Sequence, residues 1–226
     1  MVGTGSFVVV TSAVQYLRPD NAFIFRIAHV ENVAEVLTRG GLYSRNADQA
    51  DPNYVSIGNA ELIDKRARRI VPIPPGGVLN DYVPFYFTPL SIMMYNILTG
   101  YGGVTKHAPS DLILFTSSLH RLREHGLPFV FTNQHAYPVE TEFFTDLGDL
   151  DRIDWPLLRS RNFKTDDADP GKQVRYQAEA LVHQHVPLET LRSIVCYDDE
   201  VRERLQDQAQ TVGVEIPIQT APTLYF

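Results

Sequence analysis

Short hydrophobic runs recur along this chain, and polar or glycine-containing segments separate them. Runs rich in β-branched and aromatic residues predict strands at residues 23–27, 83–87, 111–115, 129–132, 177–182, 193–197 and 216–219. Apolar residues at helical spacing predict helices over 30–37, 61–69, 117–126 and 198–210, with one or two more inside 143–161. The strands outnumber the helices and do not alternate regularly with them, which favours an α+β fold over a doubly wound sheet.

Several breaks in this pattern predict loops and element ends. Gly40 and Gly41 stop the first helix, and residues 45–59 form a polar loop. The segment 74–77, Pro-Pro-Gly-Gly, is irregular because two fixed φ angles precede two permissive ones. Pro84 predicts an edge position, or the beginning, for its strand.

Length and composition restrict the class of protein. The chain has 226 residues, a length that predicts one domain. The first predicted strand begins at Phe23, so the domain is expected over 23–226 and an N-terminal tail, partly disordered, over 1–22. A net charge of -7 excludes a broad cationic surface, so any contact with nucleic acid must come from a local patch. No stretch is long enough to span a membrane, and the single cysteine, Cys196, fits a reducing, cytoplasmic compartment.

Two groups of polar residues are candidates for chemistry or metal binding. Glu179 lies between Ala178 and Ala180 on a predicted strand, so it is either a solvated glutamate or a carboxylate that stabilises a developing sugar cation. His183 and His185 could bind a metal from one face of a strand, but no Cys, Asp or Glu near them completes a site. We therefore expect no metal.

The one dense cationic cluster comprises Lys65, Arg66, Arg68 and Arg69. Such a run is ordinarily a solvated helix face. Here it precedes the aromatic segment 82–87, and cations beside aromatic faces suit a single-stranded nucleic acid. Both interpretations remain open on composition alone.

Three separated segments together resemble one known family, the DNA ADP-ribosyltransferase toxins named DarT. They are PPGGVLNDYVPFYFTPLSIMMY, GLPFVFTNQHA and RYQAEALVHQHVP, in the family's order, and the resemblance runs from about Phe23 to Phe226. It implies an α+β ADP-ribosyltransferase fold, with two small facing β-sheets around an NAD cleft and peripheral helices. It also implies transfer of ADP-ribose from NAD onto a base of single-stranded DNA, with a macrodomain antitoxin as the partner that removes the mark.

The resemblance also implies roles for individual residues. The catalytic group is Glu179, Arg66 and His135, in which Glu179 is the glutamate of the QAE motif. The residues implied for NAD, which is a substrate here, are Arg26, His29, Asn32, Arg66, Tyr86 and Met93. Lys65, Arg68, Arg69 and Arg161 are the expected contacts for DNA.

One position departs from the family's pattern. Arg26 stands where members of the family carry a histidine. Arginine occurs at this place in other ADP-ribosyltransferase branches, so we expect NAD binding to survive, while thymine and guanine both remain possible targets. Two other functions also stay open from the residues: an NAD glycohydrolase, and a non-catalytic module that binds single-stranded nucleic acid.

Overall fold

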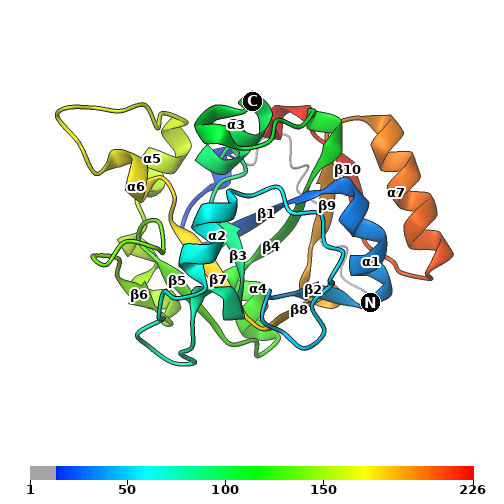
Figure 1. Cartoon of the computed structure of the whole chain (residues 1–226), viewed down its shortest axis with the longest axis horizontal. Helices are drawn as coiled ribbons and strands as arrows, with labels where there is room; N and C mark the ends of the chain where they lie inside the picture. The colour runs from blue at the N-terminus through cyan, green and yellow to red at the C-terminus, as the bar shows by residue number, and fades with distance from the viewer. Residues whose placement is uncertain (1–13) are drawn as a thin grey trace.

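The computed structural model describes residues 14–226, in which helices surround a mixed, largely antiparallel sheet (Figure 1). The strands are β1 (Phe23–His29), β2 (Gly41–Tyr43), β3 (Tyr82–Tyr86), β4 (Leu112–Ser118), β5 (Phe129–Thr132), β6 (Phe143–Phe144), β7 (Glu179–His183), β8 (His185–Pro187), β9 (Ser193–Cys196) and β10 (Ile218–Thr220). The α-helices are α1 (Val33–Thr38), α2 (Ala60–Arg66), α3 (Ile92–Thr99), α4 (Leu119–Glu124), α5 (Trp155–Ser160), α6 (Lys172–Arg175) and α7 (Asp199–Thr211). The 3-10 helices are η2 (Val30–Asn32), η3 (Leu79–Asp81), η4 (Tyr101–Gly103), η5 (Pro109–Asp111), η6 (Leu147–Arg152), η7 (Leu188–Thr190) and η8 (Pro222–Leu224).

The main sheet has the strand order β10-β9-β4-β1-β3-β7-β5-β6, and it consists of two half-sheets joined at one place. Within the first half-sheet, β1 pairs with β4 over its whole length, from Phe23 to His29. Between the halves, β1 and β3 share a single register pair, Phe25 with Tyr86. Strands β2 and β8 form a separate two-stranded sheet. The predicted α+β architecture with small sheets around a cleft is therefore confirmed.

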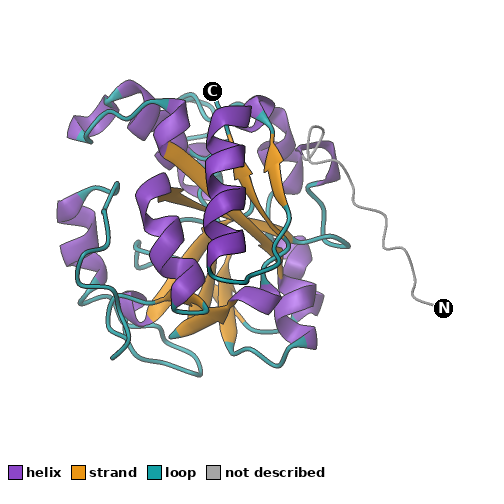
Figure 2. Cartoon of the chain, turned by 90° about the vertical axis from the view of Figure 1, so that its right-hand side faces the viewer, coloured by secondary structure: helices purple, strands orange, loops and turns teal. Residues whose placement is uncertain are grey.

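The core explains which strands are central. Every residue of β4 is buried, because β1 and β9 flank it and packed side chains cover both of its faces. Helix α7 begins at the N-cap Asp198, whose side chain accepts a hydrogen bond from Val201 N. It packs against α1 and β10, and Figure 2 shows this side of the molecule, with helices in front of the strands.

The observed helices and strands differ from the predicted ones in three respects. Residues 143–161 were expected to hold one or two helices, and they hold β6, η6 and α5. The predicted helix over 61–69 ends earlier, at Arg66. The sequence pattern did not predict β2, β8, α3 or α6, because the strands are three residues long and α3 is apolar around most of its circumference.

Pro84 lies inside β3, and its position is close to an edge in practice. Strand β3 lies between β1 and β7 in the sheet, but β1 pairs with it only at Tyr86. At Pro84 the strand therefore has a paired neighbour on one side only, in β7. The missing N–H of proline therefore leaves no ladder hydrogen bond unmade on that side.

The part of the N-terminal segment that is described packs on the domain. Leu17 is fully buried, and Arg159 Nη1 donates to its carbonyl oxygen at 2.7 Å. Residues 1–13 of the predicted tail, which was expected over 1–22 and in part disordered, lie outside the described residues. Within residues 14–226, no helix is both long enough and apolar enough to cross a membrane.

Candidate active site

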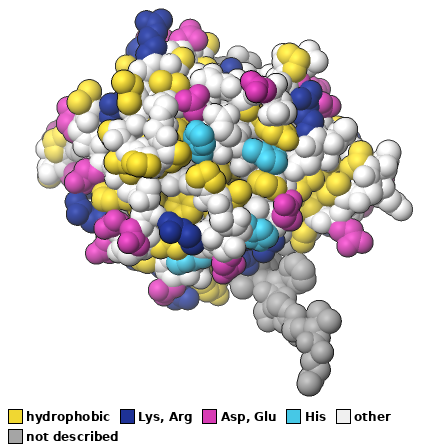
Figure 3. Space-filling view, turned by 90° about the horizontal axis from the view of Figure 1, so that it is seen from below, with side chains coloured by type: hydrophobic (Ala, Val, Ile, Leu, Met, Phe, Trp, Pro, Cys, Tyr) yellow, Lys and Arg dark blue, Asp and Glu magenta, His cyan; other side chains and the backbone are white. Residues whose placement is uncertain are grey.

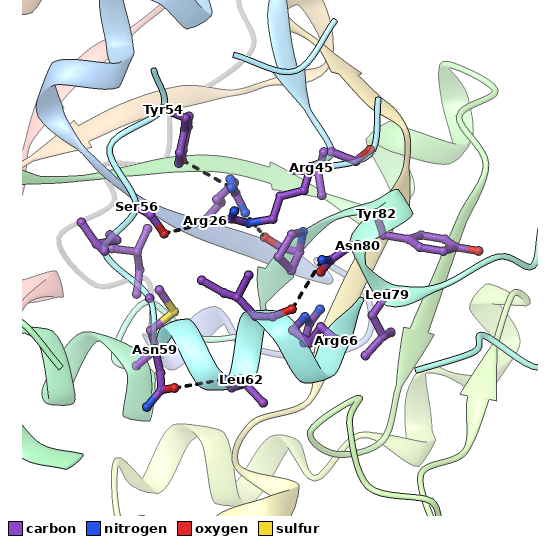
Figure 4. Close-up of a pocket in the computed structure, with 18 of the residues that line it drawn as sticks. Arg26, Arg45, Tyr54, Ser56, Asn59, Leu62, Arg66, Leu79, Asn80 and Tyr82 are labelled. Carbon is purple, nitrogen blue, oxygen red and sulfur yellow. Dashed lines mark hydrogen bonds between the residues drawn. The ribbon is translucent and has the colours of Figure 1, made fainter. Parts of the chain in front are cut away.

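A cleft of about 360 Å³ opens where the two half-sheets separate. Beyond the single pair at Tyr86, the strands β1 and β3 are bridged by a side chain, since Arg26 Nη1 donates to the Pro84 carbonyl oxygen at 3.1 Å. Residues from β1, β3, β7, α2, α3 and the loop over 45–59 line the cleft. The site is therefore built from segments that are far apart in the chain (Figure 4).

Glu179, the first residue of β7, lies at the bottom of the cleft opposite Tyr86 of β3. Its side chain is 1% exposed. Arg66 Nη1 lies 3.0 Å from Glu179 Oε2, and the Ala136 backbone N–H donates to Oε1 at 2.9 Å. His135 Nε2 lies 3.8 Å from the same Oε1. The carboxylate is thus neutralised and oriented by a cation and a backbone donor, and an imidazole stands beside it.

Arg66 reaches this place because of the face of α2 on which it lies. The helix begins at the N-cap Asn59, which accepts from Leu62 N, and Leu62 and Arg66 then face the cleft one turn apart. The second terminal nitrogen of Arg66, Nη2, is buried and makes no hydrogen bond to any described residue. A buried guanidinium with a free donor is suited to an anion that enters the cleft.

An aromatic and a thioether line the wall above Glu179. The Tyr86 hydroxyl lies 3.5 Å from Met93 Sδ. Burial, together with the negative charge of Glu179, raises the pKa of Tyr86 far above its usual value. The ring therefore stays neutral and offers a fixed planar surface.

The surroundings of His135 favour the neutral form of its imidazole. Burial lowers the pKa of His135; the Glu179 carboxylate opposes that shift and the Arg66 cation adds to it. The backbone N–H of His135 donates to the Val174 carbonyl oxygen at 2.9 Å, which fixes the residue beside the cleft. A neutral imidazole at this place can accept a proton.

The loop over 45–59 also lines the cleft, although its sequence pattern predicts no site role. Arg26 Nη2 lies 3.4 Å from the Tyr54 hydroxyl, and Arg45 Nη2 donates to Ser56 Oγ at 2.9 Å (Figure 4). The signal that could have identified this loop is Arg45 and Tyr54, a cation and an aromatic within a segment that is mostly polar.

Two of the residues predicted to hold NAD do not line this cleft. Asn32 does not line the cleft, and its amide both donates to the Val55 carbonyl at 3.0 Å and accepts from Val55 N at 2.8 Å. His29 also lies outside the lining and caps η2 through Nδ1, which accepts from Glu31 N. In this structure Asn32 fastens the loop that lines the cleft, because its side chain replaces backbone partners that the loop lacks. Direct contact of His29 or Asn32 with NAD stays a prediction.

The residues predicted to bind DNA are in four different situations. Lys65 Nζ is paired with Glu61 Oε1 at 2.6 Å, whereas Arg68 is exposed and makes no ion pair with any described residue. Arg69 Nη2 donates to the Pro138 carbonyl oxygen at 2.9 Å, and its guanidinium lies over the Phe143 ring. Arg161 is exposed at the end of α5 and does not line the cleft. Figure 3 shows one face of the molecule, on which Lys and Arg are scattered among Asp and Glu.

The two histidines that follow Glu179 pack against aromatic rings. His183 meets Tyr82 edge to face, and His185 stacks on Tyr43 with ring centroids 4.2 Å apart. Across residues 14–226, the structure holds no group of three or more His, Cys, Asp or Glu side chains that could bind a metal ion.

Comparison with known proteins defines the class to which this fold and cleft belong. A solved structure of DarT from Thermus sp. 2.9 in complex with ADP-ribosylated single-stranded DNA superposes with a TM-score of 0.85 at 31% identity, over 92% of this chain and 98% of that one. The same protein in complex with NAD+ gives a TM-score of 0.82 at 30% identity, with 92% and 99% covered. The protein is an ADP-ribosyltransferase by fold.

The sequence comparisons identify the family within that class. The family model described as "ssDNA thymidine ADP-ribosyltransferase, DarT" matches residues 25–226. A DNA ADP-ribosyl transferase of Escherichia coli O127:H6 (strain E2348/69 / EPEC) is 43% identical over 210 residues, which are 93% of this chain and 96% of that protein. The chain belongs to the DarT family. It is an enzyme that uses NAD as a substrate and transfers ADP-ribose to single-stranded DNA.

Proposed function

We propose that this enzyme attaches ADP-ribose to thymidine in single-stranded DNA, with Glu179, Arg66 and His135 as its catalytic residues. The observation that carries the assignment is the convergence of these three side chains at the bottom of one cleft, with Glu179 Oε2 3.0 Å from Arg66 Nη1. Thymidine is chosen because the matching family model is described by that nucleoside. Guanine, which the sequence left open, is the alternative that the test below distinguishes.

Each residue has a role that follows from its surroundings. Displacement of nicotinamide at the ribose anomeric carbon develops positive charge on the sugar, and the fixed carboxylate of Glu179 stabilises it. Arg66 lines the cleft, and its Nη2, which is buried and has no partner among the described residues, binds a phosphate oxygen of NAD. Tyr86 offers its ring to the nicotinamide. Glu179 or His135 accepts the proton that the attacking base nitrogen loses.

The test of this function follows the masses of both products. The protein is incubated with NAD alone and with NAD plus each of four single-stranded oligonucleotides that lack one base. We expect nicotinamide release and a mass increase of one ADP-ribose on every oligonucleotide except the one without thymine. Loss of the reaction only when guanine is missing would overturn the thymidine assignment, and equal nicotinamide release without DNA would instead support a glycohydrolase.

The pH dependence of the reaction reports on His135. Because burial lowers its pKa, the imidazole gains its proton at a lower pH in the folded enzyme than in an unfolded chain. If His135 is the base, the acidic limb of kcat/KM falls below pH ~6.5, the usual imidazole value, and His135→Gln removes this limb. A limb centred above that value would contradict the assignment.

The same shift predicts a stability effect of known sign. Between the two pKa values the unfolded chain binds more protons at His135 than the folded protein does. The free energy of unfolding therefore decreases as the pH falls below about 6.5, through the lowered pKa of the folded state. Denaturant titrations at several pH values give the free energy of unfolding of the wild type and of His135→Gln. The contribution of His135 is the difference between the two slopes of this free energy against pH.

DNA binding is expected to be only moderately sensitive to salt. The protein carries a net charge of -7, and the exposed cations near the cleft include Arg45, which lines it, and Arg68, which follows the end of α2. If roughly three phosphates are neutralised, the slope of log affinity against log salt is about −2 for a single strand. A labelled oligonucleotide titrated at several salt concentrations measures it. A slope steeper than about −4 would place the DNA on a different surface.

We further propose a macrodomain partner that removes the modification and a cytoplasmic site of action, where NAD and DNA are both available. Support for the partner comes from a relative in Thermosipho africanus described as a DNA ADP-ribosyl transferase-DNA ADP-ribosyl glycohydrolase fusion protein, 22% identical over 90% of this chain. Expression of the active enzyme is expected to arrest growth, and a co-expressed macrodomain glycohydrolase is expected to relieve it. Harmless expression of an enzyme that is active in vitro would contradict this proposal.

A further inference from the structure

The strands β5 and β7 part at the place where Glu179 enters the cleft. Their ladder pairs Phe131 with Ala180, and it stops before the next position, which would pair Thr132 with Glu179. At this point the Thr132 side chain, in place of the strand pairing, makes the hydrogen bond to the Glu179 backbone. Its hydroxyl accepts from the Glu179 backbone N–H at 3.1 Å and donates to the Gln134 carbonyl oxygen at 2.6 Å. Thr132 is fully buried, and its bond from the Glu179 N–H is buried as well, whereas the bond to Gln134 is partly buried.

The chain that leaves Thr132 then folds back over the glutamate side chain. Two residues after Gln134, the backbone N–H of Ala136 donates to Glu179 Oε1 at 2.9 Å. His135 from the same turn places Nε2 3.8 Å from that oxygen. One hydroxyl therefore ties the backbone of Glu179 to the turn that orients both its carboxylate and the neighbouring imidazole.

We propose that Thr132 is a positioning residue for the transfer reaction, whose hydroxyl sets the distance between Glu179 and the turn over 133–136. A hydroxyl is both donor and acceptor, and it satisfies two backbone groups at once. Valine has the same shape and can do neither, so Glu179 N–H and Gln134 C=O would have to move to find partners. The inference rests on the catalytic role proposed above for Glu179.

The test compares two buried strand threonines. Thr132→Val is compared with Thr116→Val, because Thr116 is also buried and its hydroxyl bonds to Ser193 Oγ at 2.8 Å in the first half-sheet. We expect Thr132→Val to lower kcat on the order of 10²-fold, as a small misplacement of reacting groups does, with the KM for NAD nearly unchanged. Thr132→Ser is expected to restore most of this loss. Thr116→Val is expected to lose thermal stability and keep kcat.

Equal kcat values for the two valine variants, or a loss that appears only in KM, would overturn the inference. If Thr132→Val does not fold, Thr132→Ala, which removes the same hydroxyl, is measured in its place with the same expected result. Glu179→Gln is measured in parallel and separates the two levels of failure. Wild-type turnover by that variant would refute the role of Glu179 itself, whereas an inactive Glu179→Gln beside a fully active Thr132→Val would refute only the positioning role.

Discussion

The Glu179→Gln variant is expected to fold and to transfer ADP-ribose at least about 10²–10³-fold more slowly than the wild type. Glutamine preserves the size of the side chain, and its carbonyl oxygen can still accept from Ala136 N–H, which now bonds to Oε1. The negative charge is lost, however, and this charge stabilises the cationic sugar in the transition state. Mass spectrometry of a modified oligonucleotide under single-turnover conditions measures the rate.

A matched control shows whether the slower transfer comes from the carboxylate in the cleft or from the change in the protein's net charge. Glu203→Gln makes the same chemical change on the exposed face of α7, away from the cleft, and is expected to leave the rate unchanged. Near-wild-type transfer by Glu179→Gln, in protein that melts cooperatively, would show that the carboxylate is not the stabilising group.

The second large effect is expected for Arg66→Ala, which weakens both the fold and the use of NAD. Glu179 is 1% exposed, and removal of Arg66 leaves its charge buried without a cation. Breaking a buried pair in this way costs about 3–5 kcal/mol of unfolding free energy. Loss of Nη2 also removes the donor proposed for a phosphate, so kcat/KM for NAD falls together with DNA modification. Thermal melting and NAD titrations measure the two effects.

Two further variants, one at the last residue of α2 and one just after it, show whether the effect is specific to the Arg66 guanidinium. Arg66→Lys keeps a charge but not the planar fork, so it should recover more stability than turnover. Arg68→Ala removes an exposed cation two residues away and should lower DNA affinity with no change in the KM for NAD. An Arg66→Ala enzyme with unchanged NAD affinity and turnover would show that the cleft does not use this guanidinium.

The four cations at 65–69 have different contacts in the folded protein. The four cations at 65–69 look equivalent in sequence, yet Arg66 points to Glu179 and Arg69 holds the Pro138 carbonyl at 2.9 Å. Only helical geometry and the approach of the loop from β5 distinguish them. Lys65 is meanwhile paired along the helix with Glu61, an exposed pair of the kind that adds little stability.

The sequence by itself determined the elements whose signals are local. The strands near 23–27, 111–115 and 129–132 and the helix after Asp198 follow from residue type, periodicity and a capping side chain, all within a few neighbouring residues. The motif around Glu179 and its resemblance to DarT also sufficed to predict the class of fold, which the comparisons confirmed.

Only the tertiary structure decided which of these residues share a site. The pairing of β2 with β8, the separation of β1 from β3 beside Pro84, and the use of Asn32 to fasten residue Val55 all depend on partners that are remote in the chain. Such contacts form when separate elements bury their apolar faces together, and local periodicity carries no record of which elements will meet. For that reason the local patterns indicated Glu179 and Arg66 separately, the family resemblance alone grouped them, and the fold brings their side chains to 3.0 Å.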